Sequence, residues 1–344
     1  MRIVVTGGCG FIGSNFIRHL VAVRLDAEIL NLDALTYAAN PLSLAGLESN
    51  PRYHFARVDL GEFGPTQSVI RAFAPTHVVH FAAESHVDRS ISGPLPFARS
   101  NMLGTANLIE AVRGLNAGVR FHHISTDEVF GSLTDDGKFD ENTPYDPSSP
   151  YSASKAASDF WVRAYAHTFG MDVVITNCSN NYGPYQFPEK LIPLMILNAV
   201  GGKALPVYGA GANVRDWLYV QDHCEAILAV LERGRTGETY CVGGDSEMSN
   251  LDVVHAICRE VARQTGKTTD ELTQLIQFVP DRPGHDYRYA IDASKLKSEL
   301  GWAPKHRFEE GLQETVRFYL EQTEWVNSVT SGAYREWIAR HYGS

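Results

Sequence analysis

Five residues in the middle of the chain have the types and spacing that acid and base chemistry requires. Thr126, Asp127 and Glu128 are consecutive, and Tyr151 stands four residues before Lys155. Residues four apart share one face of a helix, so we expect the Lys155 ammonium to favour the Tyr151 phenolate and to lower its pKa from about 10 toward neutrality. Tyr151 would then be a base for oxidation of an alcohol. The adjacent carboxyls supply the acid and second base that loss of water needs. The pattern predicts oxidation coupled to elimination.

The carboxyl pair also has a plainer interpretation, because a Thr-Asp-Glu run often only caps a turn. Adjacent side chains of an extended strand point to opposite faces, so both carboxyls reach one substrate only if the chain turns near Asp127. Phe130 and Gly131 permit such a turn. The run follows the fifth predicted strand, at the sheet edge where ligands of open α/β sheets bind. Together with Tyr151 and Lys155, this position favours the chemical interpretation.

Short β-branched runs alternate with helical patterns along the first half of the chain. This alternation predicts an α/β fold with a doubly wound parallel sheet of the Rossmann type. After about residue 178, Gly, Pro and aromatic residues crowd the sequence and predict a smaller, loop-rich C-terminal part over 179–344. Part of about 214–245 is expected to pack back onto the first unit, 1–178. The predicted strands are 2–6, 28–32, 53–58, 77–81, 120–125 and 172–176. The predicted helices are 14–25, 65–73, 101–112 and 152–169, with Asn101 and Ser152 near their N-caps.

The composition excludes several classes of protein. The 344 residues are 44% apolar, enough for a packed core, and their net charge of −10 argues against nucleic acid or an anionic membrane surface as partner. The five cysteines have no C-x-x-C spacing, so we expect neither a disulfide framework nor a metal site. No run approaches the roughly 20 apolar residues of a membrane span, and the N-terminal apolar run is too short for a signal peptide. The sequence predicts a soluble cytoplasmic protein.

Three glycines between the first strand and the first helix indicate a dinucleotide site. Gly7, Gly10 and Gly13 let the backbone approach a pyrophosphate at a helix N-terminus, although alone they also fit a plain tight βα turn. Asp33 ends the second strand, where a carboxylate accepts hydrogen bonds from an adenosine ribose. No Arg or Lys follows it at 34–36 to neutralise a 2′-phosphate, so the cofactor is predicted to be NAD. Asp59 is either an adenine contact or a helix cap.

The motifs taken together resemble the extended short-chain dehydrogenase/reductase family, and within it most closely the branch that dehydrates nucleoside-diphosphate glucose. The resemblance runs from residue 1 to about residue 320. Phe130 stands where the family usually has Tyr, and Cys9 where it often has Ala. The matching segments are the glycine run at 7–13, Asp-x-Leu-Thr-Tyr at 33–37, Ala-Ala-Glu-Ser-His-Val-Asp at 82–88, the Thr-Asp-Glu run, Tyr-x-x-x-Lys at 151–155 and Asn-Asn-Tyr-Gly-Pro at 180–184.

The resemblance implies a role for each of the five central residues. Tyr151 takes the proton of the sugar 4-hydroxyl while hydride passes from C4 to NAD⁺, assisted by Thr126 and Lys155. Glu128 then removes the C5 proton and Asp127 protonates the departing 6-hydroxyl. Hydride returns to C6 and leaves a 4-keto-6-deoxy sugar. The expected substrate is dTDP-glucose, although the sequence does not by itself identify the base.

The family also implies binding residues on both sides of this centre. Arg215, Lys190 and Arg282 are the cations that a diphosphate would need in an acidic chain, and without the resemblance each would be an ordinary surface charge. The implied cofactor contacts are Gly7, Gly10, Phe11, Ile12, Gly13, Asp33, Ala34, Leu35, Thr36, Asp59, Leu60, Phe81, Ala82, Ala83, Ser85, Ser100, Tyr151, Lys155 and Asn181. The implied substrate contacts are Ser85, Thr126, Asn180, Lys190, Leu191, Pro206, Tyr208, Arg215, Asn250, Arg282 and His285.

By analogy with the family, the helices predicted at 101–112 and 152–169 pair with those of a second copy, so we expect a homodimer. Two other functions stay open. A nucleotide-sugar 4-epimerase shares the fold, NAD, Tyr and Lys but has no use for Asp127 and Glu128. A dinucleotide-sensing protein without catalysis would have no need to keep Thr126, Tyr151 and Lys155.

Overall fold

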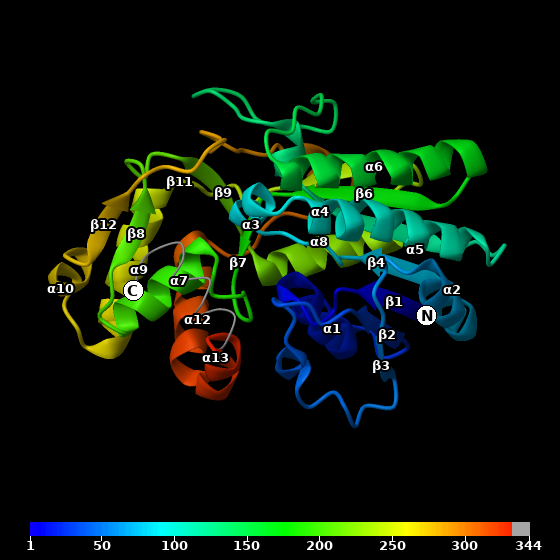
Figure 1. The fold of residues 1–344 in the computed structure, drawn as a ribbon, viewed down its shortest axis with the longest axis horizontal. Helices are drawn as coiled ribbons and strands as arrows, with labels where there is room; N and C mark the ends of the chain where they lie inside the picture. The colour runs from blue at the N-terminus through cyan, green and yellow to red at the C-terminus, as the bar shows by residue number, and fades with distance from the viewer. Residues whose placement is uncertain (332–344) are drawn as a thin grey trace.

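A large parallel sheet forms the centre of the molecule (Figure 1). The computed structural model describes residues 1–331, and within them this sheet has seven strands in the order β10-β6-β5-β4-β1-β2-β3. The strand order reverses between β1 and β4, which is where open α/β sheets bind ligands. The predicted doubly wound sheet is confirmed, and so are its six predicted strands. The strands are β1 (Arg2–Thr6), β2 (Glu28–Asp33), β3 (Tyr53–Arg57), β4 (His77–His80), β5 (Arg120–Thr126), β6 (Val173–Cys178) and β10 (Thr239–Val242).

Helices cover both faces of this sheet because successive strand residues point to opposite sides. In β1, Val4 packs into the apolar core beneath α2, α5 and α6, whereas Ile3 and Val5 belong to the core beneath α1 and α8. In Figure 1 the labelled strands β6, β4, β1, β2 and β3 of this sheet follow one another from top to bottom. The helices are α1 (Phe11–Val23), α2 (Phe63–Phe73), α5 (Gly104–Arg113), α6 (Pro150–Phe169) and α8 (Val220–Arg233).

The start of α6 fits the prediction, but the predicted N-cap at Asn101 is wrong. Ser149 caps α6, and its side chain and that of Ser152 exchange hydrogen bonds with each other's backbone. Asn101 instead lies inside a π-helical stretch, η2 (Ala98–Leu103), that runs directly into α5. Its side chain accepts from the Glu84 amide (2.8 Å) and donates to the Glu84 carbonyl (2.9 Å). The amide therefore holds a neighbouring loop beside the helix rather than starting the helix.

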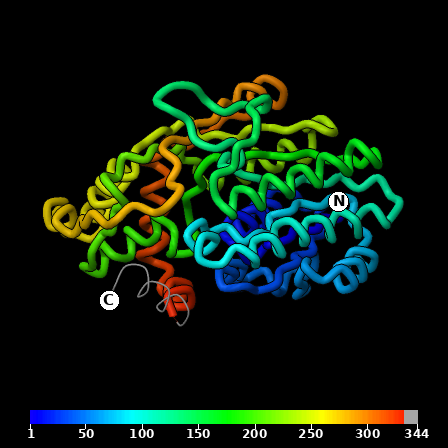
Figure 2. Tube along the Cα trace, turned by 45° about the horizontal axis from the view of Figure 1, so that its top comes forward, coloured from blue at the N-terminus to red at the C-terminus, as the bar shows by residue number. Residues whose placement is uncertain are grey.

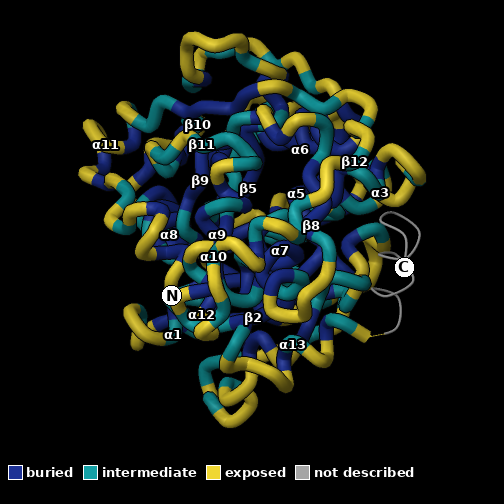
Figure 3. Tube along the Cα trace, turned by 90° about the vertical axis from the view of Figure 1, so that its left-hand side faces the viewer, coloured by how far each residue is buried: buried dark blue, intermediate teal, exposed yellow. Residues whose placement is uncertain are grey.

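The later half of the chain builds a second apolar core beside the large sheet (Figure 2). Burial follows the strands and the inner helix faces, while the outer loops are exposed (Figure 3). Two late segments, α8 and β10, join the large sheet; the division at residue 178 stays a prediction. No helix within residues 1–331 is long and apolar enough to cross a membrane. The remaining elements are η1 (Pro41–Leu44), α3 (Val87–Ser92), α4 (Leu95–Phe97), η3 (Asp127–Phe130), β7 (Asn180–Tyr182), α7 (Leu191–Val200), β8 (Leu205–Tyr208), β9 (Val214–Tyr219), β11 (Glu247–Ser249), α9 (Asn250–Thr265), α10 (Thr269–Thr273), β12 (Ile276–Val279), α11 (Ser294–Leu300), α12 (Phe308–Glu321) and α13 (Thr323–Val329).

Candidate active site

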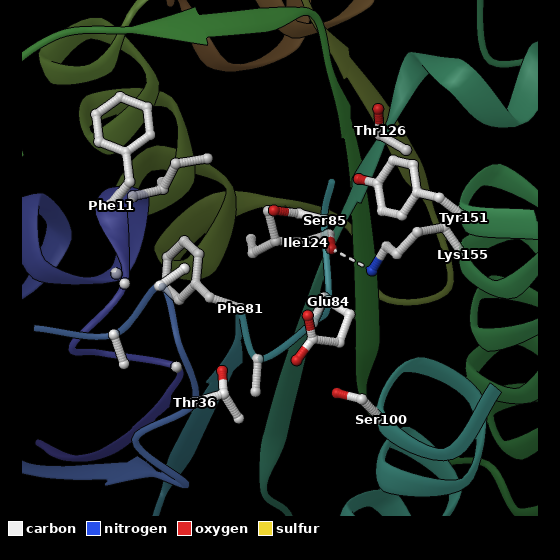
Figure 4. A pocket seen from close by; sticks show the side chains of 18 of the residues that line it. Phe11, Thr36, Phe81, Glu84, Ser85, Ser100, Ile124, Thr126, Tyr151 and Lys155 are labelled. Atoms are coloured by element: carbon white, nitrogen blue, oxygen red, sulfur yellow. Dashed lines mark hydrogen bonds between the residues drawn. The ribbon is translucent and has the colours of Figure 1, made fainter. Parts of the chain in front are cut away.

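A cavity of about 450 Å³ opens at the carboxyl ends of the central strands (Figure 4). Its wall runs from the glycine turn after β1 to Tyr151 and Lys155 on α6. This volume lies in the range of small-molecule and cofactor sites. The wall includes every implied cofactor contact except Leu35, together with the five central residues. The structure therefore brings the two ends of the predicted site into one cavity.

The glycine turn leaves room for a ligand beside the first turn of α1. Gly7 has φ +68°, and a Cβ on it would lie 2.8 Å from the Ala82 Cα. A Cβ on Gly13 would lie 2.3 Å from the Gly7 carbonyl oxygen, so glycine is required for α1 to pack this closely. Gly10 precedes α1 and offers no side-chain cap to its amides. Backbone N–H groups at such a helix start bind a pyrophosphate, so the turn fits a dinucleotide.

Asp33 presents a fixed carboxylate to the same cavity. Its Oδ2 accepts from the Cys9 amide (2.9 Å) and its Oδ1 from the Leu35 amide (2.8 Å). Burial raises the pKa of Asp33, while these two hydrogen bonds counteract the rise. Leu35 has φ +56° and lies outside the cavity wall. The carboxylate still has lone pairs for a ribose diol, which fits NAD.

Asp59 lines the cavity near the end of β3. Its Oδ1 accepts from the Gly61 amide (2.8 Å) and its Oδ2 from Arg99 (3.0 Å). The alternative interpretation of Asp59 as a helix cap is wrong, because the N-cap of α2 is Glu62. The adenine contact stays a prediction.

Tyr151 and Lys155 point from one face of α6 into the cavity (Figure 4). The Lys155 ammonium donates to the Ile124 carbonyl at 2.9 Å. The Tyr151 ring packs edge-on against Phe97, with centroids 6.3 Å apart. Figure 4 shows the Tyr151 hydroxyl on the Thr126 side. This half of the site is therefore held by packing and by the backbone of β5.

The expected lowering of the Tyr151 pKa is wrong where only the protein's own groups act on the hydroxyl. Burial raises the pKa of Tyr151 well above its usual value, the charges of Glu128 and Asp127 raise it further, and a hydrogen bond with Thr126 counteracts them. Burial also lowers the pKa of Lys155. The physical reason is that Tyr151 is buried beside two carboxyls, which spacing along a helix does not reveal.

The carboxyl pair occupies a turn that brings both side chains to the cavity. β5 ends at Thr126 and η3 begins at Asp127, so the chain turns where the sequence required it. The Thr126 hydroxyl accepts from the Glu128 amide (3.3 Å), so the run also caps this turn. The turn-capping interpretation of the run is therefore confirmed, and the chemical interpretation stays a prediction.

The surroundings of the two carboxyls differ. Burial, followed by the charges of Glu128 and Asp216, raises the pKa of Asp127 well above its usual value. Burial raises the pKa of Glu128 as well, but Arg282, Lys190 and Arg215 counteract it. A carboxyl whose pKa is strongly raised, beside one whose charge nearby cations favour, is the arrangement of an acid and a base.

The implied substrate contacts fall into two groups. Ser85, Thr126, Asn180 and Lys190 line the cavity, while the others lie on the flanking elements beyond Glu128. Arg282 and the Tyr208 hydroxyl donate to the two oxygens of Asp88 at 3.0 and 3.2 Å. His285 Nδ1 lies 2.6 Å from Asp281 Oδ1. Arg215 donates to the backbone carbonyls of Val214 (2.7 Å) and Asp286 (2.9 Å). The contacts outside the cavity wall are Leu191, Pro206, Tyr208, Arg215, Asn250, Arg282 and His285.

Several cavity residues were not predicted from the sequence. The most notable are Glu84 and Glu189, two carboxyls at the cofactor end of the wall. Nothing in the sequence distinguishes a carboxyl on a cavity wall from one on the outer surface. Membership in the motif at 82–88 was the one available signal for Glu84. The other residues missed are Leu32, Ala38, Ala39, Val58, Gly61, Pro96, Arg99, Ile124, Ser125, Cys178, Ser179, Gln186 and Phe187.

Comparison with known proteins agrees with this geometry. The protein family described as GDP-mannose 4,6 dehydratase matches residues 4–315. A dTDP-glucose 4,6-dehydratase from Xanthomonas campestris pv. campestris (strain B100) is 54% identical over 344 aligned positions, covering 96% of this chain and 97% of the relative. The chain belongs to the family of nucleotide-sugar 4,6-dehydratases.

Solved structures place other sugar-nucleotide enzymes on the same fold. A dTDP-glucose 4,6-dehydratase from Streptomyces venezuelae, solved with NAD and a second ligand bound, has a TM-score of 0.89 and 45% identity, covering 96% of this chain and 100% of that chain. A UDP-glucose 4-epimerase from Thermus thermophilus, in complex with NAD, has a TM-score of 0.84 and 31% identity, covering 93% and 99%. Because both enzymes share this fold, the residues of the site must distinguish dehydration from epimerisation.

Proposed function

We propose that this protein is an NAD-dependent hydro-lyase that converts dTDP-glucose into its 4-keto-6-deoxy product. The observation that carries the proposal is that Asp127 and Glu128 line the same cavity as Tyr151 and Lys155. Oxidation at C4 needs only one base, whereas loss of water between C5 and C6 needs a further base and an acid. The relatives that are about half identical over nearly their whole length carry the name of this activity.

The cofactor end of the cavity supports NAD. The glycine turn and the first turn of α1 would hold the pyrophosphate, and Asp33 the adenosine ribose. When bound, NAD would accept a hydride from the substrate and return it within one cycle. Lys155, at the other end of the wall, would hold the nicotinamide ribose beside Tyr151.

The chain's own groups then divide the proton transfers. Tyr151 accepts the proton of the sugar 4-hydroxyl, with Thr126 holding the same oxygen. Glu128 removes the proton at C5, which the neighbouring 4-keto group makes acidic. Asp127 gives its proton to the departing 6-hydroxyl, consistent with the raised pKa of this carboxyl.

The diphosphate would be held outside this centre by the cations of the second half. The charges of Lys190, Arg215 and Arg282 each favour the Glu128 carboxylate, so all three cations lie near this carboxyl. They would stabilise a diphosphate bound beside it. We propose the same binding roles for the substrate and cofactor contacts that the family resemblance implies.

Incubation with a panel of nucleotide-linked glucoses, followed by mass spectrometry, tests the function. Loss of one water from dTDP-glucose, with NAD recovered unchanged, is the expected result. An unchanged product mass with an altered sugar configuration would show the 4-epimerase, and binding without turnover of any sugar would show the dinucleotide sensor.

We also infer that the protein is a cytoplasmic homodimer. Apolar side chains on η2 and α6 are exposed, among them Leu103, Phe160 and Trp161, and a second copy would cover them. All five cysteines are free and buried, which is consistent with a reducing compartment.

A further inference from the structure

A buried polar cluster stands behind Lys155, on the side away from the cavity. His123 on β5 and Asp159 on α6 are both fully buried and belong to no part of the cavity wall. His123 Nε2 lies 3.4 Å from the Lys155 Nζ and 3.0 Å from Asp159 Oδ1. The ammonium and the carboxyl group therefore approach the same ring nitrogen of His123.

The partners of Asp159 show that it is ionised. Its Oδ2 accepts hydrogen bonds from the Ser125 hydroxyl (2.7 Å) and the Tyr145 hydroxyl (2.8 Å). Two hydroxyl donors on one oxygen favour the carboxylate over the acid. The pKa of Asp159 is lowered even though burial opposes this, because His123 and Lys155 favour its charge.

Lys155 needs an anion of this kind. Burial favours the neutral amine, and a backbone carbonyl alone does not offset the loss of hydration. The titratable groups that face Lys155 are Tyr151 and Asp159 from its own helix, His123 from β5 and Cys178 from β6. His80 on β4 adds a ring 5.3 Å from that of His123.

Only one of these neighbours carries negative charge near neutral pH. Burial raises the pKa of the Cys178 thiol and of the Tyr151 hydroxyl, and it lowers the pKa of His123 and His80. Cys178 and both imidazoles are therefore neutral. Among the described residues facing Lys155, the fixed anion is Asp159.

We propose that Asp159 is a positioning residue: it is the counter-ion that keeps Lys155 protonated, and both groups meet at His123 Nε2. The proposal rests on the function proposed above, in which a charged Lys155 holds the cofactor ribose and supports ionisation of Tyr151. A purely structural Asp159 would serve only to hold Ser125 and Tyr145.

A double-mutant cycle on unfolding tests the charge pairing without any substrate. Lys155→Met leaves a buried carboxylate without its cation, and Asp159→Asn leaves a buried ammonium without its anion. The double variant should be more stable than the sum of the two losses predicts, by about 5-fold or more in the unfolding constant. Additive losses would overturn the proposal. Asp222→Asn is the matched control, because Asp222 is equally buried but pairs with His306, and its effect should add to that of Lys155→Met.

The pH profile of the first oxidation tests the consequence for catalysis. Without Asp159 the pKa of Lys155 falls further. The Asp159→Asn variant should therefore oxidise substrate at the parent rate at the acidic end of the profile. As the pH rises, its rate should fall at a lower pH than that of the parent. An equal loss at every pH would show a structural role and overturn the proposal. If no nucleotide sugar is turned over at all, the proposed function fails while the unfolding cycle still decides the pairing.

Discussion

The Tyr37 hydroxyl donates a 2.7 Å hydrogen bond to the carboxylate of Glu189, which lies 152 residues further along the chain. Arg89 completes the cluster: its Nε donates to the other oxygen of Glu189 at 2.9 Å, and its guanidinium lies 3.9 Å from the centre of the Tyr37 ring. Three distant segments thus meet at the cofactor end of the cavity. We infer that this cluster closes the cavity over bound NAD, whose loss in mid-cycle would strand an intermediate.

Tyr37→Phe should therefore release NAD faster. Removing one hydrogen bond to a buried carboxylate costs about 1.5 to 3 kcal/mol, so release should rise by about 10-fold or more. The measurement is the NAD content of the purified protein after repeated gel filtration, with the release rate followed by fluorescence. Tyr240→Phe is a control, because it removes another partly buried Tyr-to-Glu hydrogen bond, to Glu299, and neither residue lines the cavity. Equal NAD retention in the two variants would contradict the inference.

Tyr151→Phe should slow formation of the 4-keto sugar by about 10² to 10⁴, which is the usual loss on removal of a general base. The substitution deletes only the hydroxyl, and the ring keeps its contact with Phe97. Rapid mixing with dTDP-glucose, with enzyme-bound NADH followed by absorbance, measures this step directly. A parent-like rate of NADH formation would show that another group is the base.

The sequence predicted the sheet well because strand patterns are local. The predicted strands are short segments rich in apolar and β-branched residues, such as 3–5 in β1 and 78–79 in β4, and the turn at Asp127 was the condition for two adjacent carboxyls to reach one substrate. Asn101 was misjudged because its partner, the Glu84 backbone, is supplied by tertiary structure. The raised pKa of Tyr151 and the pairing of Tyr37 with Glu189 were equally hidden. Burial determines the first and a long-range contact the second, and neither can be predicted from the spacing of residues along the chain.

The protein should sediment as a dimer, and Leu103→Asp combined with Trp161→Asp should make it a monomer. Both side chains are more than two-fifths exposed on the neighbouring helical segments η2 and α6, and a charge on each would oppose burial against a second copy. Sedimentation velocity measures the mass. Leu25→Asp, at an even more exposed apolar residue just beyond α1, should leave the dimer intact. A monomeric parent protein would contradict the proposal.

The stability of the Asp127→Asn variant should increase relative to that of the parent protein as the pH rises. An unfolded Asp ionises near pH 4, whereas burial raises the pKa of Asp127 in the folded protein. The folded state therefore binds the Asp127 proton more tightly than the unfolded state does. This difference adds to the free energy of unfolding below about pH 4, and the added part is lost as the pH rises toward the folded pKa. The asparagine does not titrate and escapes this loss. Melting temperatures of both proteins from about pH 5 to about pH 8 measure the effect; a constant difference would place the Asp127 pKa near its usual value.

Asp127→Asn and Glu128→Gln should fail at different steps of the reaction. If Glu128 removes the C5 proton, Glu128→Gln should still oxidise C4 but exchange C5 with solvent deuterium slowly. If Asp127 protonates the 6-hydroxyl, Asp127→Asn should preserve that exchange better than it preserves water loss. NADH formation, deuterium incorporation and product mass separate the three events in one experiment.

The parent enzyme provides the reference for this comparison. Substrate with deuterium at C4 should give product with deuterium at C6 of the same molecule, because one bound cofactor both takes and returns the hydride. A washed-out label, or a product that keeps its 6-hydroxyl, would exclude the proposed sequence of steps. An epimerase would return the label to C4, so the position of the deuterium decides between the two enzymes that share this fold.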